Sequence, residues 1–218
     1  MSIFNNLGPI ARTAILGAKY SLHVIFHPFD GFYDIKHEKK GSIYTGTLFI
    51  LVLILIFIAR RQFTGFVINN ARQKDLNIIS EIISVVLPIL LWCVSNWCLT
   101  TLTEGEGSFK DIYIYTCYSL VPMILILAPL ILYSRILTVE GVAFYSFFNG
   151  FAYVWTGLLL LFGTLVTHQF TLGKTIFSVI VVIIGMGVIA FIGILFFNII
   201  QQVIEFVREV ILEYDLRV

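Results

Sequence analysis

Long apolar stretches separated by short polar segments dominate the hydrophobic pattern of this chain. They run over Ile43–Ala59, Ile82–Leu102, Asp111–Ile136, Tyr145–Val166 and Thr175–Ile200. A helix of roughly 20 apolar residues, rising about 1.5 Å per residue, crosses the hydrocarbon layer of a bilayer. The pattern therefore predicts an all-α, polytopic membrane helix bundle with about five transmembrane helices.

Amphipathic patterns flank these spans, first at the beginning of the chain. There, Arg12, Lys19 and His23 form one narrow polar stripe at a helical period, and the opposite side is apolar. This arrangement is typical of a helix that lies in the headgroup layer of a membrane. Pro28 and Gly31 are expected to end that helix.

After the last span, helical patterning continues without a helix breaker to the end of the chain. One apolar stripe is formed by Val203, Val207, Val210 and Tyr214. Because this stripe extends an already long apolar run, we expect the last helix to outrun the bilayer and project into water or along the membrane surface.

The chain is thus organised around the membrane in three regions. We expect an interfacial segment at 1–41, a five-span domain at 42–202 and an amphipathic C-terminal extension at 203–218. The composition agrees, because 59% hydrophobic residues, 12% charged residues and a mean hydropathy of +0.96 are too apolar for a soluble globule. The lipid bilayer is therefore a partner, whereas the net charge of +1 gives no reason to expect nucleic acid.

Local signals mark two helix starts and two bends. Ser108 followed by Asp111 has the spacing of a capping box at the start of the third span. Thr138 is placed to cap a new helix, with Glu140 in its first turn. Pro122 and Pro129 are expected to bend the third span.

The distribution of cations does not orient the chain in the membrane. With five spans, one side carries seven cations: Arg12, Lys19, Lys36, Lys39, Lys40, Lys110 and Lys174. The other side carries seven as well: Arg60, Arg61, Arg72, Lys74, Arg135, Arg208 and Arg217. The positive-inside rule therefore chooses neither orientation.

The most distinctive polar segment lies between the second and third spans, and we call residues 104–111 the hinge. Its candidate contact residues are Glu104, Gly105, Glu106, Gly107, Phe109, Lys110 and Asp111. Paired carboxylates can serve acid/base or divalent-ion chemistry, but no nucleophile or histidine stands beside these in the sequence. We interpret the hinge as a solvated turn whose glycines allow a sharp return into the membrane, and as a site for partner contacts.

No catalytic, cofactor-binding or metal site is predicted. His23 and His27 have the i, i+4 spacing of helical zinc ligands, but Pro28 breaks the helix directly after them. Histidines in an aromatic, interfacial segment are more often amphipathic anchors than metal ligands. We therefore expect no enzyme activity, no metal and no cofactor.

Asn96 and Asn149 are polar residues inside the predicted spans. An amide in hydrocarbon needs a hydrogen-bond partner, so each is either an interhelical contact or part of a solute path. The spans contain no series of ionisable residues for an ion or proton route, which favours the interhelical contact. Small residues at Ser146 and Gly150, and from Gly185 to Gly193, permit close helix packing.

Several short strings together resemble the Yip family, the Ypt-interacting multispan membrane proteins, and especially its short bacterial branch. They are NW at 96–97, GEGSF at 105–109, YSLVP at 118–122, HPF at 27–29, TVEG at 138–141 and EYDLR at 213–217. The resemblance implies a five-span helical protein with its N-terminal segment in the cytoplasm. We expect this multi-pass protein in the cell membrane.

The resemblance also bears on function. The eukaryotic branch acts in vesicle traffic through small GTPases and has a long polar N-terminal region with a DLYGP-type motif. This chain has about forty residues before its first span and no such motif, so GTPase binding is not carried over. Bacterial members resemble accessory membrane proteins, some of them associated with carbohydrate importers, and no catalytic residue is carried over.

Two functions remain open at this point. The first is a non-enzymatic integral membrane scaffold or accessory subunit that associates with other integral membrane proteins, such as the permease subunits of a carbohydrate ABC importer. Its contact surfaces would be the hinge and the C-terminal helix with Val207, Val210 and Tyr214. The alternative is a transporter or lipid-moving protein with a path near Asn96. A homo-oligomer is compatible with both.

Overall fold

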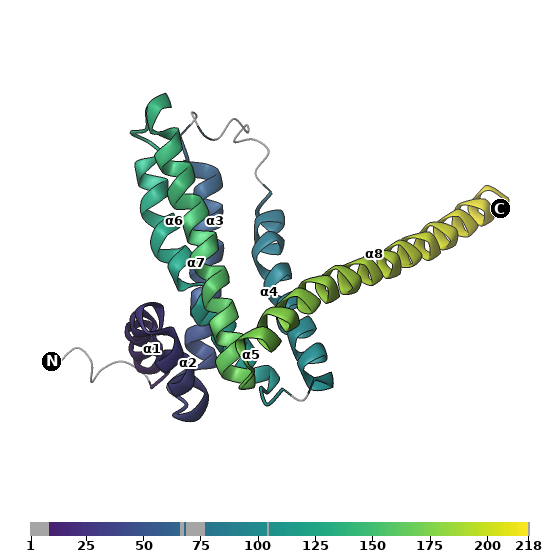
Figure 1. Cartoon of the computed structure of the whole chain (residues 1–218). Helices are drawn as coiled ribbons and strands as arrows, with labels where there is room; N and C mark the ends of the chain where they lie inside the picture. Colours follow the sequence, from purple (N-terminus) through teal and green to yellow (C-terminus); the bar gives the residue numbers. More distant parts are fainter. Residues whose placement is uncertain (1–8, 66–67, 69–76, 104, 218) are drawn as a thin grey trace.

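The computed structural model describes residues 9–65, 68, 77–103 and 105–217. Within these residues the chain is helical and has no β-strand (Figure 1). Five helical segments are long and apolar enough to cross a membrane. The predicted all-α polytopic bundle with about five spans is therefore confirmed.

The N-terminal segment forms two helices, α1 (Pro9–Phe26) and α2 (Pro28–His37), rather than one. Pro28 ends α1 as predicted, and it also begins α2 because a proline needs no hydrogen bond in the first turn. The prediction that Gly31 breaks the helix is wrong. Gly31 lies inside α2, where a Cβ would stand 2.8 Å from the Cα of Val24, so the glycine lets the two helices pack closely.

The spans follow in the order α3 (Ile43–Phe63), α4 (Ile78–Leu102), α5 (Phe109–Ser119) with α6 (Val121–Tyr133), α7 (Val142–His168) and α8 (Leu172–Arg217). The third span is broken between α5 and α6 rather than only bent. Pro122 lies in the first turn of α6, and the Leu120 N–H donates to the carbonyl of Cys117 at 3.2 Å in a tighter turn. Thr138 precedes the 3₁₀ helix η3 (Val139–Gly141), but its side chain caps nothing, contrary to the prediction.

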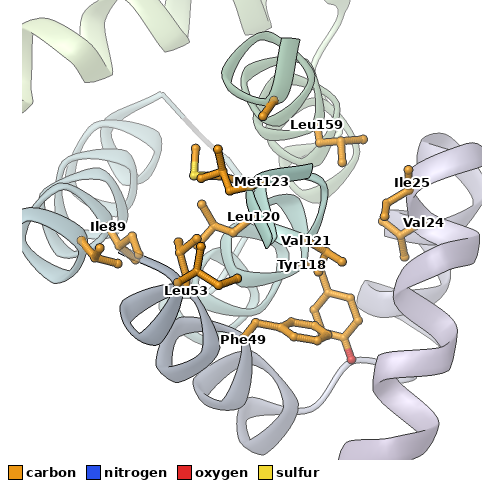
Figure 2. Close-up of a cluster of buried hydrophobic side chains, with 14 of the residues drawn as sticks. Val24, Ile25, Phe49, Leu53, Ile89, Tyr118, Leu120, Val121, Met123 and Leu159 are labelled. Atoms are coloured by element: carbon orange, nitrogen blue, oxygen red, sulfur yellow. The ribbon is translucent and has the colours of Figure 1, made fainter. Parts of the chain in front are cut away.

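The α5–α6 pair is the centre of the bundle. In its most apolar stretch 72% of the residues are buried, against 28–33% for α3, α4 and α7. Figure 2 shows labelled side chains from α1, α3, α4 and α7 gathered around this junction. The rings of Phe49 and Tyr118 meet edge to face, with 5.3 Å between their centroids. Tertiary packing in the bundle therefore depends chiefly on the third span.

Two sets of contacts define the ends of the bundle. At one end, Lys36 forms an ion pair with Glu106 at 3.1 Å, and Lys174 donates to the carbonyl of Thr103 at 2.9 Å. This end joins α2, the hinge and the start of α8, and we call it the hinge end. At the opposite end, Gly65 N–H donates to the hydroxyl of Ser134 at 3.2 Å.

Helix α8 leaves the bundle and projects away from it (Figure 1). It has 46 residues, which corresponds to about 69 Å at about 1.5 Å per residue. Only 6% of its most apolar stretch is buried. It contacts the bundle near its start, where Ser95 donates to the carbonyl of Val182 at 2.8 Å.

Candidate functional site at the hinge

The hinge begins helix α5 with the capping box that the sequence predicts. The backbone N–H of Asp111 donates to the Ser108 hydroxyl at 3.3 Å, and the backbone N–H of Ser108 donates to the Asp111 carboxylate at 3.1 Å. These bonds satisfy backbone donors that the first turn of a helix leaves without a partner. The last part of the hinge is thus a defined helix start rather than a flexible turn.

The two hinge glycines are required by close packing against His168. A Cβ on Gly105 would lie 2.6 Å from His168 Nδ1, and a Cβ on Gly107 would lie 2.6 Å from His168 Cε1. Neither glycine has a positive φ. Their role is therefore to bring the hinge backbone against a histidine ring, and not to adopt a left-handed turn.

His168 belongs to a buried hydrogen-bond chain that connects three helices. The backbone N–H of Gly107 donates to His168 Nδ1 at 3.3 Å. Since Nδ1 accepts, the ring proton is on Nε2, which donates to Asn96 Oδ1 at 3.0 Å. The Asn96 amide then donates to the hydroxyl of Tyr115 at 3.0 Å.

The hydrogen-bond chain continues to α7, and its donors and acceptors can be assigned there as well. The Thr164 hydroxyl donates to the carbonyl of Leu160 at 2.8 Å, so it accepts from the Tyr115 hydroxyl at 3.0 Å. We call Asn96, Tyr115, Thr164 and His168 the Asn96 network. All four are at most 2% exposed. Each donor in the network has a single acceptor on another residue. The network therefore favours one relative arrangement of α4, α5 and α7 at the hinge end.

The network supports the interpretation of Asn96 as an interhelical contact. An unpaired polar group in hydrocarbon costs several kcal/mol, and both ends of the Asn96 amide are paired. Asn149 differs, because its Oδ1 is buried without a partner among the described residues. Sequence reasoning did not identify Tyr115 and His168, since their roles depend on distant partners.

The remaining hinge residues lie at the surface of the hinge end. Glu106 pairs with Lys36 of α2, and the ring of Phe109 meets Trp97 edge to face at 6.1 Å between centroids. Lys110 is exposed. Glu104 lies outside the described residues. The described residues of the predicted contact surface therefore lie beside a buried polar network.

The C-terminal candidates are on a separate surface. Val207, Val210 and Tyr214 of α8 are between 49% and 69% exposed. They lie far along the helix from its contacts with α4 and α7, so the structure does not bring them together with the hinge (Figure 1).

The N-terminal charges form a small cluster that joins α1 to α2. The Asp34 carboxylate binds the Lys40 ammonium at 2.6 Å and the Tyr20 hydroxyl at 2.9 Å. These two bonds hold the pKa of Asp34 below its usual range. His23 and His27 stack on each other with centroids 5.1 Å apart. In the part of the chain that the structure describes, no three potential metal ligands cluster.

These features define an integral membrane protein: a bundle with five helices long and apolar enough to cross a membrane, and with a buried polar network at one end. Comparison with known families then identifies it further. The chain matches the Yip1 domain over residues 22–193 and belongs to this family. The match includes the hinge, the whole Asn96 network and the first part of α8. No curated protein and no solved structure matches the chain.

Proposed function

We propose that this protein is a non-enzymatic scaffold or accessory subunit that associates with other integral membrane proteins through α8. The observation that carries the proposal is the small buried share of α8, 6%, in a helix that is apolar over most of its length. A helix that serves only to complete the bundle would pack along its length, as α5 and α6 do. Helix α8 therefore has most of its surface free for another protein.

The surface of α8 is suited to helix–helix contact inside and outside the bilayer. A Cβ placed on Gly187 or Gly193 would meet no atom within 4 Å, so both glycines are open to the close approach of another helix. Beyond the hydrocarbon layer, which is about 30 Å thick, the stripe of Val207, Val210 and Tyr214 continues. Exposed apolar stripes of this kind are characteristic of protein interaction surfaces.

The base of α8 is tied to the hinge end of the bundle. Lys174 in its first turn donates to Thr103, and the ring of Phe170 stacks on His168 with 5.4 Å between centroids. A partner held by α8 is therefore mechanically connected to the hinge and to α2. This arrangement supports the hinge as the second contact surface.

The proposal also includes the family branch, the membrane, the orientation and the partner. We place the protein in the short bacterial branch of the family, in the cell membrane, with the N-terminal segment in the cytoplasm. The permease subunits of a carbohydrate ABC importer are the candidate partners. The hydrogen bonds of Asn96 favour a structural role over a solute path, so we assign transport to the partner and not to this chain.

Site-specific photocrosslinking tests the proposal. A photoreactive amino acid at Val207 or Val210 is expected to form an adduct with another integral membrane protein, identified by mass spectrometry. The control is Leu55 on α3, which is 64% exposed and on an outer face of the bundle. An adduct of twice the chain mass would identify a second copy as the partner.

Truncation provides the second part of the test. A chain ending at Gln202 retains the described contacts of α8 with α4 and is expected to lose the partner. If every co-purifying protein stays bound to the truncated chain, or if the Leu55 position forms the same adducts, the proposal is wrong.

A further inference from the structure

A cavity of about 300 Å³ lies at the end of the bundle opposite the hinge. It is formed by α3, α4 and α7 together with Thr64 and Ile68, and it shares no residue with the Asn96 network. The lining residues are Phe57, Arg60, Arg61, Thr64, Ile68, Glu81, Ser84 and Tyr145. Neither the family assignment nor the proposed function gives this cavity a role.

One wall of the cavity is cationic. Arg60 is in the last turn of α3 and forms no ion pair with any described residue; its guanidinium donates to the Tyr153 hydroxyl at 3.4 Å. Arg61 follows it and lines the same space. A half-buried guanidinium without a carboxylate partner is a binding group for an anion, and its planar donors fit phosphate oxygens.

Two hydroxyl groups beside this wall have no partner. Tyr145 is 3% exposed, and its hydroxyl is buried without a hydrogen bond to any described residue. The same holds for the Thr64 hydroxyl. Buried polar groups are nearly always paired, so these two hydroxyls are open to a further partner, and both residues line the cavity.

The other wall is acidic. Glu81 is in the first turn of α4, and its carboxylate forms no ion pair with a described residue. Arg60 and Glu81 thus line one cavity without bonding each other. A ligand that carries a phosphate and an ammonium on separate atoms matches both walls at once.

We propose that this cavity binds the phosphoethanolamine headgroup of a membrane phospholipid. Arg60, Tyr145 and Thr64 donate to the phosphate, and Glu81 accepts from the primary ammonium. The ligand is a lipid because Arg60 and Glu81 stand where the apolar runs of α3 and α4 end, which is the depth of the headgroup layer. The inference does not depend on the association through α8.

The test is native mass spectrometry of the full chain in detergent. The probes are phosphatidylethanolamine, phosphatidylglycerol and phosphatidylcholine with identical acyl chains. One phosphatidylethanolamine is expected to bind with about tenfold higher affinity than either other lipid, since it alone offers a primary ammonium that can donate a charge-assisted hydrogen bond to Glu81. Phosphatidylglycerol has no ammonium for Glu81, and the ammonium of phosphatidylcholine has no proton to donate.

Single substitutions test the contribution of each cavity wall to lipid binding. Arg60→Gln and Tyr145→Phe are expected to weaken binding of phosphatidylethanolamine and phosphatidylglycerol alike, by about tenfold and about fivefold. Glu81→Gln is expected to abolish the preference for phosphatidylethanolamine. Matched controls are Arg135→Gln and Tyr133→Phe, at the same end of the bundle and outside the cavity. Thermal unfolding of each variant verifies that it is folded.

Three outcomes would overturn the proposal. The first is equal binding of all three lipids by the unmodified chain. The second is unchanged binding by folded Arg60→Gln and Tyr145→Phe variants. The third is competition by soluble glycerophosphoethanolamine or inorganic phosphate as effective as that of the lipid, which would assign the cavity to a free solute.

Discussion

Replacing Gly107 by alanine is expected to destabilise the hinge end of the bundle. The new Cβ would lie 2.6 Å from His168 Cε1 and 2.9 Å from the Thr167 Cγ2, both well inside ordinary contact distance. His168 has little room to move, because Nδ1 and Nε2 are both hydrogen-bonded. The overlap therefore has to be relieved by displacing the hinge backbone.

The cost follows from two contributions. Forcing a methyl group into a packed site costs about 1–3 kcal/mol, and loss of the Gly107–His168 hydrogen bond costs about 1 kcal/mol more. A total of about 2–4 kcal/mol in a chain of this size corresponds to a fall in Tm of at least about 4 °C. The control is Gly150→Ala on α7, where a Cβ meets no atom within 4 Å. Alanine there is expected to be neutral or to stabilise α7 by up to about 1 kcal/mol.

Thiol reactivity provides the assay. Cys93 and Cys117 are free and buried, so a thiol-reactive fluorescent dye reports their exposure when the bundle unfolds on heating. Cys98 is exposed and gives the signal at low temperature. If Gly107→Ala unfolds at the same temperature as the unmodified chain, or if Gly150→Ala lowers the Tm equally, the packing argument for the hinge glycines is refuted.

Three further predictions use the same assay. Asn96→Leu leaves two buried partners unpaired and is expected to cost about 2–5 kcal/mol, whereas Asn149→Leu is expected to cost little because its oxygen has no partner among the described residues. The depressed pKa of Asp34 stabilises the fold above the unfolded pKa of about 3.9, and this contribution is lost as the pH falls below that value. Asp34→Asn should therefore lower the Tm at neutral pH and flatten its decline in acid; an unchanged decline would contradict this. Glu106→Gln is expected to change stability by less than about 1 kcal/mol, since the Glu106 side chain is 58% exposed, and a larger loss would mean that the ion pair with Lys36, and not the glycine packing, holds the hinge.

The hinge illustrates how the meaning of a motif depends on its neighbours. As a sequence, the twin glycines indicate a sharp return into the membrane. In the structure they are contact points for the ring of His168, a residue that the sequence places in a connection between two spans. Residue 107 has to be a glycine although its φ is not positive, because its backbone N–H bonds to the His168 ring, which in turn bonds to Asn96, and a Cβ would overlap that ring.

Features that depend on nearby residues and on the solvent could be predicted from the sequence. The five spans follow from apolar runs that only a bilayer accommodates, and the Ser108 capping box follows from a spacing of three residues. The motifs that resemble the Yip family could be recognised for the same reason, since each is short and contiguous in the sequence. The helix end predicted at Gly31 was wrong, because this glycine lies inside α2, where it packs against α1.

Which polar groups meet depends on the packing of the helices and could not be predicted in this way. Asn96 and His168 are 72 residues apart, and helical periodicity gives each residue a face but not a partner on another helix. The same holds for the cavity that brings Arg60, Glu81 and Tyr145 together from three helices. Local partitioning between water and lipid specifies where the chain crosses the membrane, whereas packing among the spans specifies what their buried polar side chains can bind.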